Sequence, residues 1–174
     1  HREMKKNYAY LFLLALVWAC NPTTEVKEEK SNTDEFVWQT EQFADLKLIR
    51  YQIPGFDKLS LDQKKLVYYL TQAGLSGRDI IWDQNYRYNL KIRTALENIV
   101  KNYEGDKTSE SWKNFMVYVK RLWFSNGIHH HYSMAKINPD FSADYLDSLL
   151  VATGTSLIDE AVAVIFDPTL DNKK

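Results

Sequence analysis

The chain has 174 residues, of which 45% are apolar and 14% aromatic, and its formal net charge is −1. This length allows one domain with a real core, or part of a larger protein. The charge balance, with no basic excess on one element, argues against a nucleic-acid-binding surface. We therefore expect a globular protein that does not bind nucleic acid.

The N-terminal residues are similar to the signal peptide of a bacterial lipoprotein. A short positive start at residues 4–6 precedes an apolar stretch at residues 8–18, which is too short to span a bilayer as a mature helix. Residues 17–20 read Val-Trp-Ala-Cys, which resembles a lipobox and would place lipid on Cys20. We expect a signal peptide at residues 4–20 and a lipid-anchored protein of the cell envelope, periplasmic or at the outer membrane. An ordinary signal or a buried N-terminal helix is the alternative.

The segments that flank the body of the chain are polar. Residues 21–35 carry a run of charged side chains, which predicts a flexible tether between the lipid and the domain. Residues 167–174 predict a polar tail, which we interpret as a truncation point. Three residues precede Met4, so the ends of this chain need not be the ends of the protein.

The body of the chain, residues 36–166, begins with a strand signal. Residues 46–53 alternate apolar and polar side chains before Pro54-Gly55, which predicts a strand. Residues 36–42 predict a short helical or extended segment. Amphipathic helices follow, so the expected fold class is mainly α, with a short β element near residues 46–53.

Capping and glycine signals divide the remainder into helices. Ser60 and Gln63 form a capping-box pattern, and the helix that they begin is expected to end at Gly74 and Gly77. Its apolar residues recur at helical spacing: Leu66, Val67, Leu70 and Ala73. Further helices are expected over 78–83, from Tyr86 to Gly105, over 112–123, from Ser142 to Gly154, and from a Thr155 or Ser156 cap to Asp167-Pro168. The stripes that predict the core are Ile92, Ala95, Leu96, Ile99, Val100 and Tyr103, then Trp112, Phe115, Met116, Val119, Leu122 and Trp123.

Titratable side chains gather in one stretch, residues 126–137, which we call the histidine loop. Asn126-Gly127 is a strong turn signal that ends the preceding helix, and three histidines follow at residues 129–131. Adjacent histidines point in different directions, and only His1 and Cys20 remain to complete a metal site. A loop that hydrogen-bonds to its neighbours or lines a cleft is therefore favoured over a native metal site. The candidate substrate-cleft residues are Asn126, His129, His131 and Tyr132.

Complete catalytic motifs are absent from the sequence. It contains no phosphate-binding or dinucleotide-binding glycine pattern, no Gly-x-Ser-x-Gly and no His-Glu-x-x-His. The pair Asp159-Glu160 stands at an expected helix start, where the helix dipole explains it without catalysis. Arg78, Arg87 and Arg93 could bind a substrate carboxylate, but surface ion pairs are the simpler interpretation. We name no catalytic residue in this chain.

Two segments resemble the dipeptidyl peptidase III family of zinc metallopeptidases, in its Bacteroidota-type members. The first is Leu-Ser-Leu-Asp-Gln-Lys-Lys-Leu-Val-Tyr-Tyr-Leu-Thr-Gln-Ala-Gly at residues 59–74, continued by Ser-Gly-Arg-Asp-Ile-Ile-Trp-Asp-Gln at 76–84. The second and more specific segment is residues 122–139, where a Ser-Asn-Gly core precedes an aromatic and basic stretch. The resemblance covers most of residues 36–166 and only the N-terminal part of a full family member.

This resemblance implies a two-lobed peptidase that removes dipeptides from peptide N-termini, with zinc in one lobe and the peptide substrate between the lobes. The family's His-Glu-x-x-Gly-His helix and its later ligand helix are not in this chain, so zinc would belong to the full-length protein. Residues 36–166 would supply scaffold and one wall of the peptide cleft. The missing C-terminal part of the same polypeptide would cover apolar faces that this chain leaves open.

Two alternatives from other functional classes stay open. One is a complete small helical lipoprotein that binds a partner or peptide without catalysis, held at the membrane by lipid on Cys20. The other is a metal-binding module that uses His129 and His131.

Overall fold

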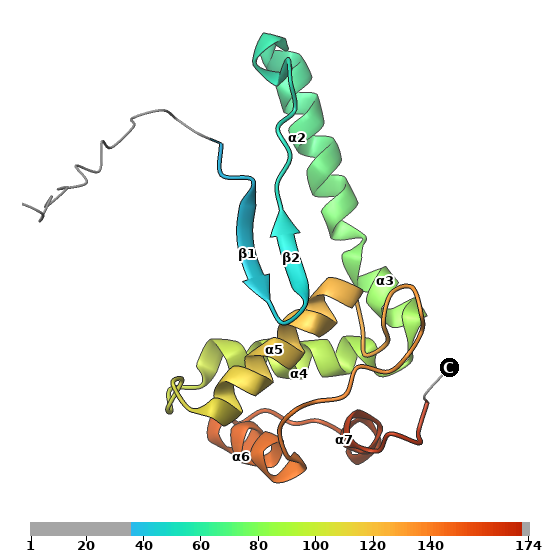
Figure 1. The fold of residues 1–174 in the computed structure, drawn as a ribbon. Helices are drawn as coiled ribbons and strands as arrows, with labels where there is room; N and C mark the ends of the chain where they lie inside the picture. Colours follow the sequence, from blue (N-terminus) through green and yellow to red (C-terminus); the bar gives the residue numbers. More distant parts are fainter. Residues whose placement is uncertain (1–35, 172–174) are drawn as a thin grey trace, which may run out of the picture. The chain divides into compact units, whose positions relative to one another are not determined.

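The computed structural model describes residues 36–171, and all structural statements below concern that part of the chain (Figure 1). The expected signal peptide at 4–20, the lipidation of Cys20 and the tether at 21–35 lie outside the described residues. The mainly α fold class with a small β element is confirmed, since helices follow a two-stranded antiparallel sheet. Among the described helices, none combines the length and apolar character that a membrane span needs.

The sheet is a hairpin of β1 (Gln39–Phe43) and β2 (Leu46–Ile49). Phe43 faces Leu46 across the turn, where Ala44 adopts a positive φ of 48°. The strand prediction for residues 46–53 is thus confirmed to Ile49 and is wrong beyond it. The strand β1 is largely polar in sequence, so its extended form depends on pairing with β2, a contact that local periodicity does not report.

The longest uncovered element is α2 (Leu61–Ser76), which follows the short 3₁₀ turn η1 (Phe56–Lys58). Its capping box is confirmed, because Ser60 Oγ accepts from the Gln63 amide at 3.3 Å and Gln63 Oε1 accepts from the Ser60 amide at 2.9 Å. The helix continues through Gly74 and ends at Ser76, so its expected glycine end is confirmed at Gly77, the C-cap. None of its residues is buried. The next helix, α3 (Arg78–Asn85), buries only Trp82.

The core is formed by α4 (Asn89–Asn102), α5 (Glu110–Ser125), α6 (Ala143–Thr153) and α7 (Asp159–Phe166), which gather together in Figure 1. Most of the expected stripes are confirmed as core, while the outer members, including Met116 and Trp123, are half-buried. Full burial of one such side chain stabilises the fold by roughly 1.5–3 kcal/mol. The most completely buried side chains are Trp82, Ile92, Leu96, Ile99, Phe115, Tyr118, Val119, Leu122, Ile128, Leu146, Leu149 and Ile165.

The start of α7 differs from the sequence prediction. Neither Thr155 nor Ser156 caps it; the N-cap is Ile158, which makes no side-chain capping bond. The Thr155 hydroxyl instead accepts from Asn98 Nδ2 at 2.6 Å and lies 2.7 Å from the Thr153 hydroxyl. The threonine therefore ties the α6–α7 connection to α4, a tertiary role that its sequence neighbours do not reveal.

Candidate functional site

The histidine loop begins at the C-terminus of α5 and folds back on itself. Asn126 and Gly127 both take positive φ, 54° and 151°, and both amides donate to the Leu122 carbonyl, as the turn signal predicts. Across the loop, the Ile137 amide donates to the Ile128 carbonyl at 2.8 Å. The His130 amide likewise donates to Ala135 at 2.7 Å. These bonds hold the loop as a small irregular hairpin on the end of a buried helix.

His129 is directed into the protein. Its side chain is only 7% exposed, and Nε2 lies 2.7 Å from the Asp171 carbonyl oxygen, so Nε2 carries a proton and donates. The Tyr86 ring packs edge-on against the imidazole at 5.3 Å, and the Tyr86 hydroxyl bonds to the Asp171 carboxylate. Burial, together with that bond, raises the pKa of Tyr86 to about 12. His129 thus anchors the loop from behind.

Lys136 provides a second anchor on the other arm of the loop. Its buried ammonium donates to the carbonyl oxygens of Val164 at 2.9 Å and Leu170 at 2.7 Å, and also to that of Asp167. These carbonyls lie at the C-terminus of α7 and just beyond it, where a cation is favourable. Burial lowers the pKa of Lys136 from its ordinary value, and the nearby Asp167 and Asp171 partly oppose that shift. Residues 167–171, expected to belong to a polar tail, therefore hold the loop in place.

The solvent face of the loop is aromatic. Tyr132 is 86% exposed, and its ring lies 4.2 Å from the His131 ring. His131 also stacks on His130 at 4.5 Å and meets the edge of Phe124 at 5.1 Å. His130 Nδ1 accepts from the backbone amides of residues 132 and 133, so its proton is on Nε2 in the neutral form. This exposed face can stack on, and donate hydrogen bonds to, an extended peptide.

The structure brings three of the four predicted residues, Asn126, His129 and His131, to the lining of one pocket, and Tyr132 lies outside that lining. His131 and Tyr132 lie side by side at the surface, and Asn126 is half-buried at the start of the loop. His129 lies behind the loop with Nε2 already bonded. A direct contact between His129 and substrate therefore requires its other nitrogen, Nδ1.

A pocket of about 150 Å³ opens between the start of α4 and the histidine loop. It is lined by Asn85 and Asn89 on one side and by side chains between Ser125 and Met134 on the other. Asn89 is 1% exposed; its Oδ1 accepts from the Ile128 amide at 3.1 Å, whereas its Nδ2 has no partner. Sequence analysis missed both Asn89 and Lys136, because an asparagine at a helix start and a lysine in a loop give no local sign of burial.

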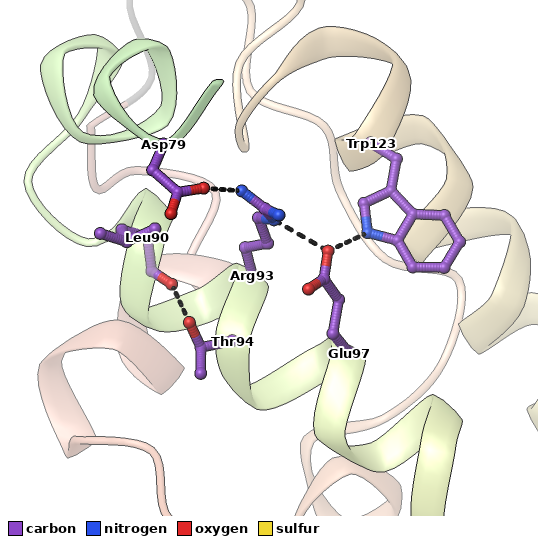
Figure 2. Close-up of polar contacts among 6 residues, drawn as sticks. All are labelled: Asp79, Leu90, Arg93, Thr94, Glu97 and Trp123. Carbon is purple, nitrogen blue, oxygen red and sulfur yellow. Dashed lines mark hydrogen bonds and ion pairs between the residues drawn. The ribbon is translucent and has the colours of Figure 1, made fainter. Parts of the chain in front are cut away.

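A polar network holds α3, α4 and α5 together (Figure 2). Arg93 contacts Asp79 at 2.5 Å and Glu97 at 2.8 Å, and Glu97 also accepts from the Trp123 indole at 3.1 Å. The Arg93 guanidinium lies 5.4 Å from the centre of the Trp82 ring. Arg93, considered above as a carboxylate ligand, is thus used in ion pairs within the fold.

A second hollow, with a volume of about 780 Å³, lies between α4 and residues 154–158. It is open, and two lysines, Lys91 and Lys101, stand at it. None of the predicted cleft residues lines it. The pocket at the histidine loop is smaller and more enclosed than this hollow.

No family model and no curated protein matches this chain. Across residues 36–171, no group of three or more His, Cys, Asp or Glu side chains is placed to hold a metal ion. Among these residues, His129 and His131 have no third candidate ligand beside them.

Proposed function

We propose that residues 36–166 are the N-terminal helical region of a zinc-dependent dipeptidyl peptidase, and that the histidine loop forms part of the wall of its peptide cleft. The sequence resemblance carries the proposal. The observation that supports it best is the construction of the loop: an exposed aromatic and imidazole face on a backbone fixed by two buried anchors, His129 and Lys136. Preorganised loops of this kind are suited to binding because little ordering is needed when the ligand arrives.

The uncovered apolar surface supports a larger protein around this region. From Leu66 to Ser76, α2 has no charged residue, and its apolar side chains face more than one side of the helix. A helix that is apolar on several sides is normally buried. Continuous exposed apolar surface marks a site of contact with another part of the protein or a partner. Large apolar side chains at least 40% exposed here include Val37, Trp38, Ile49, Tyr51, Ile53, Leu61, Leu66, Val67, Tyr68, Tyr69, Leu70, Leu75, Ile80 and Ile81.

Zinc and the catalytic glutamate would come from outside the described residues, and we derive no chemical step from them. Within this proposal the chain's own residues bind and position the peptide. The alternative, a small helical lipoprotein that binds a partner without catalysis, would use the same exposed apolar surface. Peptidase activity of the complete gene product would favour the peptidase, and its absence would favour the lipoprotein that binds without catalysis.

The test replaces His131 and Tyr132 together with alanine in the complete gene product. Both side chains are exposed, so the variant should fold normally while its KM for a peptide substrate rises by about three- to tenfold, as expected for the loss of one or two modest contacts. Lys113→Ala is the matched control, because Lys113 is an exposed residue near the other end of α5 that pairs with Glu110. Unchanged KM and kcat in the double variant would contradict the proposed role of the loop.

A further inference from the structure

We propose that the pocket between Asn89 and the histidine loop binds a carbonyl oxygen of the peptide backbone through Asn89 Nδ2. The identification of the ligand as a peptide rests on the proposed function. The pocket itself does not, because it follows from one unsatisfied donor and the space beside it.

The orientation of the Asn89 amide is fixed by its other partner. Oδ1 accepts from the Ile128 backbone amide, and only an oxygen can do so, which leaves the NH₂ group as the free end. That nitrogen is buried and has no hydrogen-bond partner among the described residues. A buried unsatisfied donor costs about 1–3 kcal/mol, so this side chain favours an acceptor that enters the pocket.

The pocket has room for such an acceptor. At about 150 Å³ it exceeds the space of a single water, which takes roughly 30 Å³ in the liquid. Its lining contains amides, a hydroxyl, imidazoles and a thioether, with no Asp, Glu, Lys or Arg. A lining that has no Asp, Glu, Lys or Arg and carries a free N–H donor suits the oxygen of an uncharged carbonyl better than a cation or a doubly charged anion.

Gly127 leaves room for the Asn89 amide beside the turn. A Cβ at this position would overlap the Asn89 side-chain nitrogen, and φ is 151°, a value that side chains rarely allow. The turn that ends α5 thus places bare backbone next to the free donor. Glycine at such positions commonly permits close approach of a ligand.

The first experiment observes the Asn89 side-chain NH₂ resonances of the 174-residue chain by NMR while tri-alanine amide is added. We expect a saturable shift of both resonances, and a Kd about three- to tenfold weaker in Asn89→Asp, which keeps the acceptor for Ile128 but removes the donor. Asn102→Asp is the matched control, since the Asn102 amide already donates to Asn98 and lies outside the pocket. Its Kd should equal that of the unchanged chain.

Three results would overturn the inference. Resonances that do not move at saturating peptide would show that water alone satisfies Asn89. An unchanged Kd in a folded Asn89→Asp variant would exclude the donor role. If that variant does not fold, the presence or absence of the resonance shift in the unchanged chain tests the role instead. Binding of tri-alanine with a free carboxylate, but not of its amide, would assign the pocket to carboxylates instead.

The outcome is separable from that of the proposed function. A shift with tri-alanine amide, combined with no dipeptide release by the complete gene product, would retain the pocket and remove the peptidase. Dipeptide release with no shift at Asn89 would retain the peptidase and remove the pocket.

Discussion

At the scale of single residues, the candidate site depends on buried side chains whose hydrogen bonds hold the histidine loop in place. His129 and Lys136 bond to backbone carbonyls at and beyond the end of α7, while Asn89 bonds to the amide of Ile128. Each joins segments that are distant in the sequence. The shape of the exposed face is therefore set by buried polar contacts, which are costly to leave unmade.

Replacing Lys136 with methionine should destabilise the fold by about 1–3 kcal/mol, because several carbonyl oxygens near the end of α7 lose their donor. Methionine retains most of the apolar stem, so packing changes little. Urea unfolding measures the effect. Lys113→Met, at an exposed site, is the control and should stay within about 0.5 kcal/mol of the unchanged chain. Equal stability of the two variants would show that the Lys136 contacts contribute nothing.

Replacing Gly127 with alanine should cost more than replacing Gly154 with alanine. Both glycines have positive φ, but a Cβ at Gly154 meets open space whereas one at Gly127 overlaps the Asn89 amide. Backbone strain alone is worth about 1–2 kcal/mol, and the overlap adds to it only at Gly127. Thermal unfolding of the two variants provides the comparison. A smaller loss at Gly127 would contradict the close packing described here.

The raised pKa of Tyr86 predicts that the folded chain loses stability at alkaline pH. Its pKa is about 12 in the folded chain against an ordinary 10.0, so the folded state retains a proton that the unfolded state releases. Stability from this group is present below pH 10.0 and is lost as pH rises toward about 12. Tyr86→Phe should therefore show a smaller loss over that interval in urea unfolding. Parallel pH dependence of the two proteins would exclude the effect.

At the scale of elements, local signals predicted the fold where the cause is local. The caps at Ser60, Ser142, Asn126 and Gly154 were all predicted, since a cap requires only residues a few positions apart. The strand β1 lies mostly in residues 36–42, which were expected to be helical or extended, and pairing with β2, rather than its own sequence, makes it extended. Periodicity likewise cannot say what covers a face, which is why the exposure of α2 appears only in the structure.

Replacing an apolar residue of α2 should have a small effect on the stability of the 174-residue chain and a larger effect on that of the complete gene product. Leu70 is 62% exposed, so Leu70→Glu should change the stability of the 174-residue chain by less than about 0.5 kcal/mol. In the complete gene product, where we expect the helix to be covered, the same change should cost several-fold more. The control for core burial is Leu122→Ala, which should cost about 2–5 kcal/mol in both. Equal, small effects of Leu70→Glu in both settings would indicate that nothing covers α2.

At the scale of the whole molecule, the described residues combine a well-packed helical core with a hairpin and a helix whose apolar residues are largely uncovered. The core explains stability without a disulfide, and the ion pairs from Glu41 to Lys120 and from Asp45 to Arg121 join the hairpin to α5. What the sequence could not supply is the partner of the uncovered surface. We propose that a further part of the same polypeptide covers that surface and holds the zinc centre.

The most direct test of this account is to determine the source DNA sequence onward from the codon for Lys174. We predict an open frame that continues into a His-Glu-x-x-Gly-His motif, which would make residues 36–166 the N-terminal region of a zinc dipeptidyl peptidase. A stop codon directly after Lys174, with no such motif in the same frame, would contradict the account and favour a small lipoprotein that binds without catalysis.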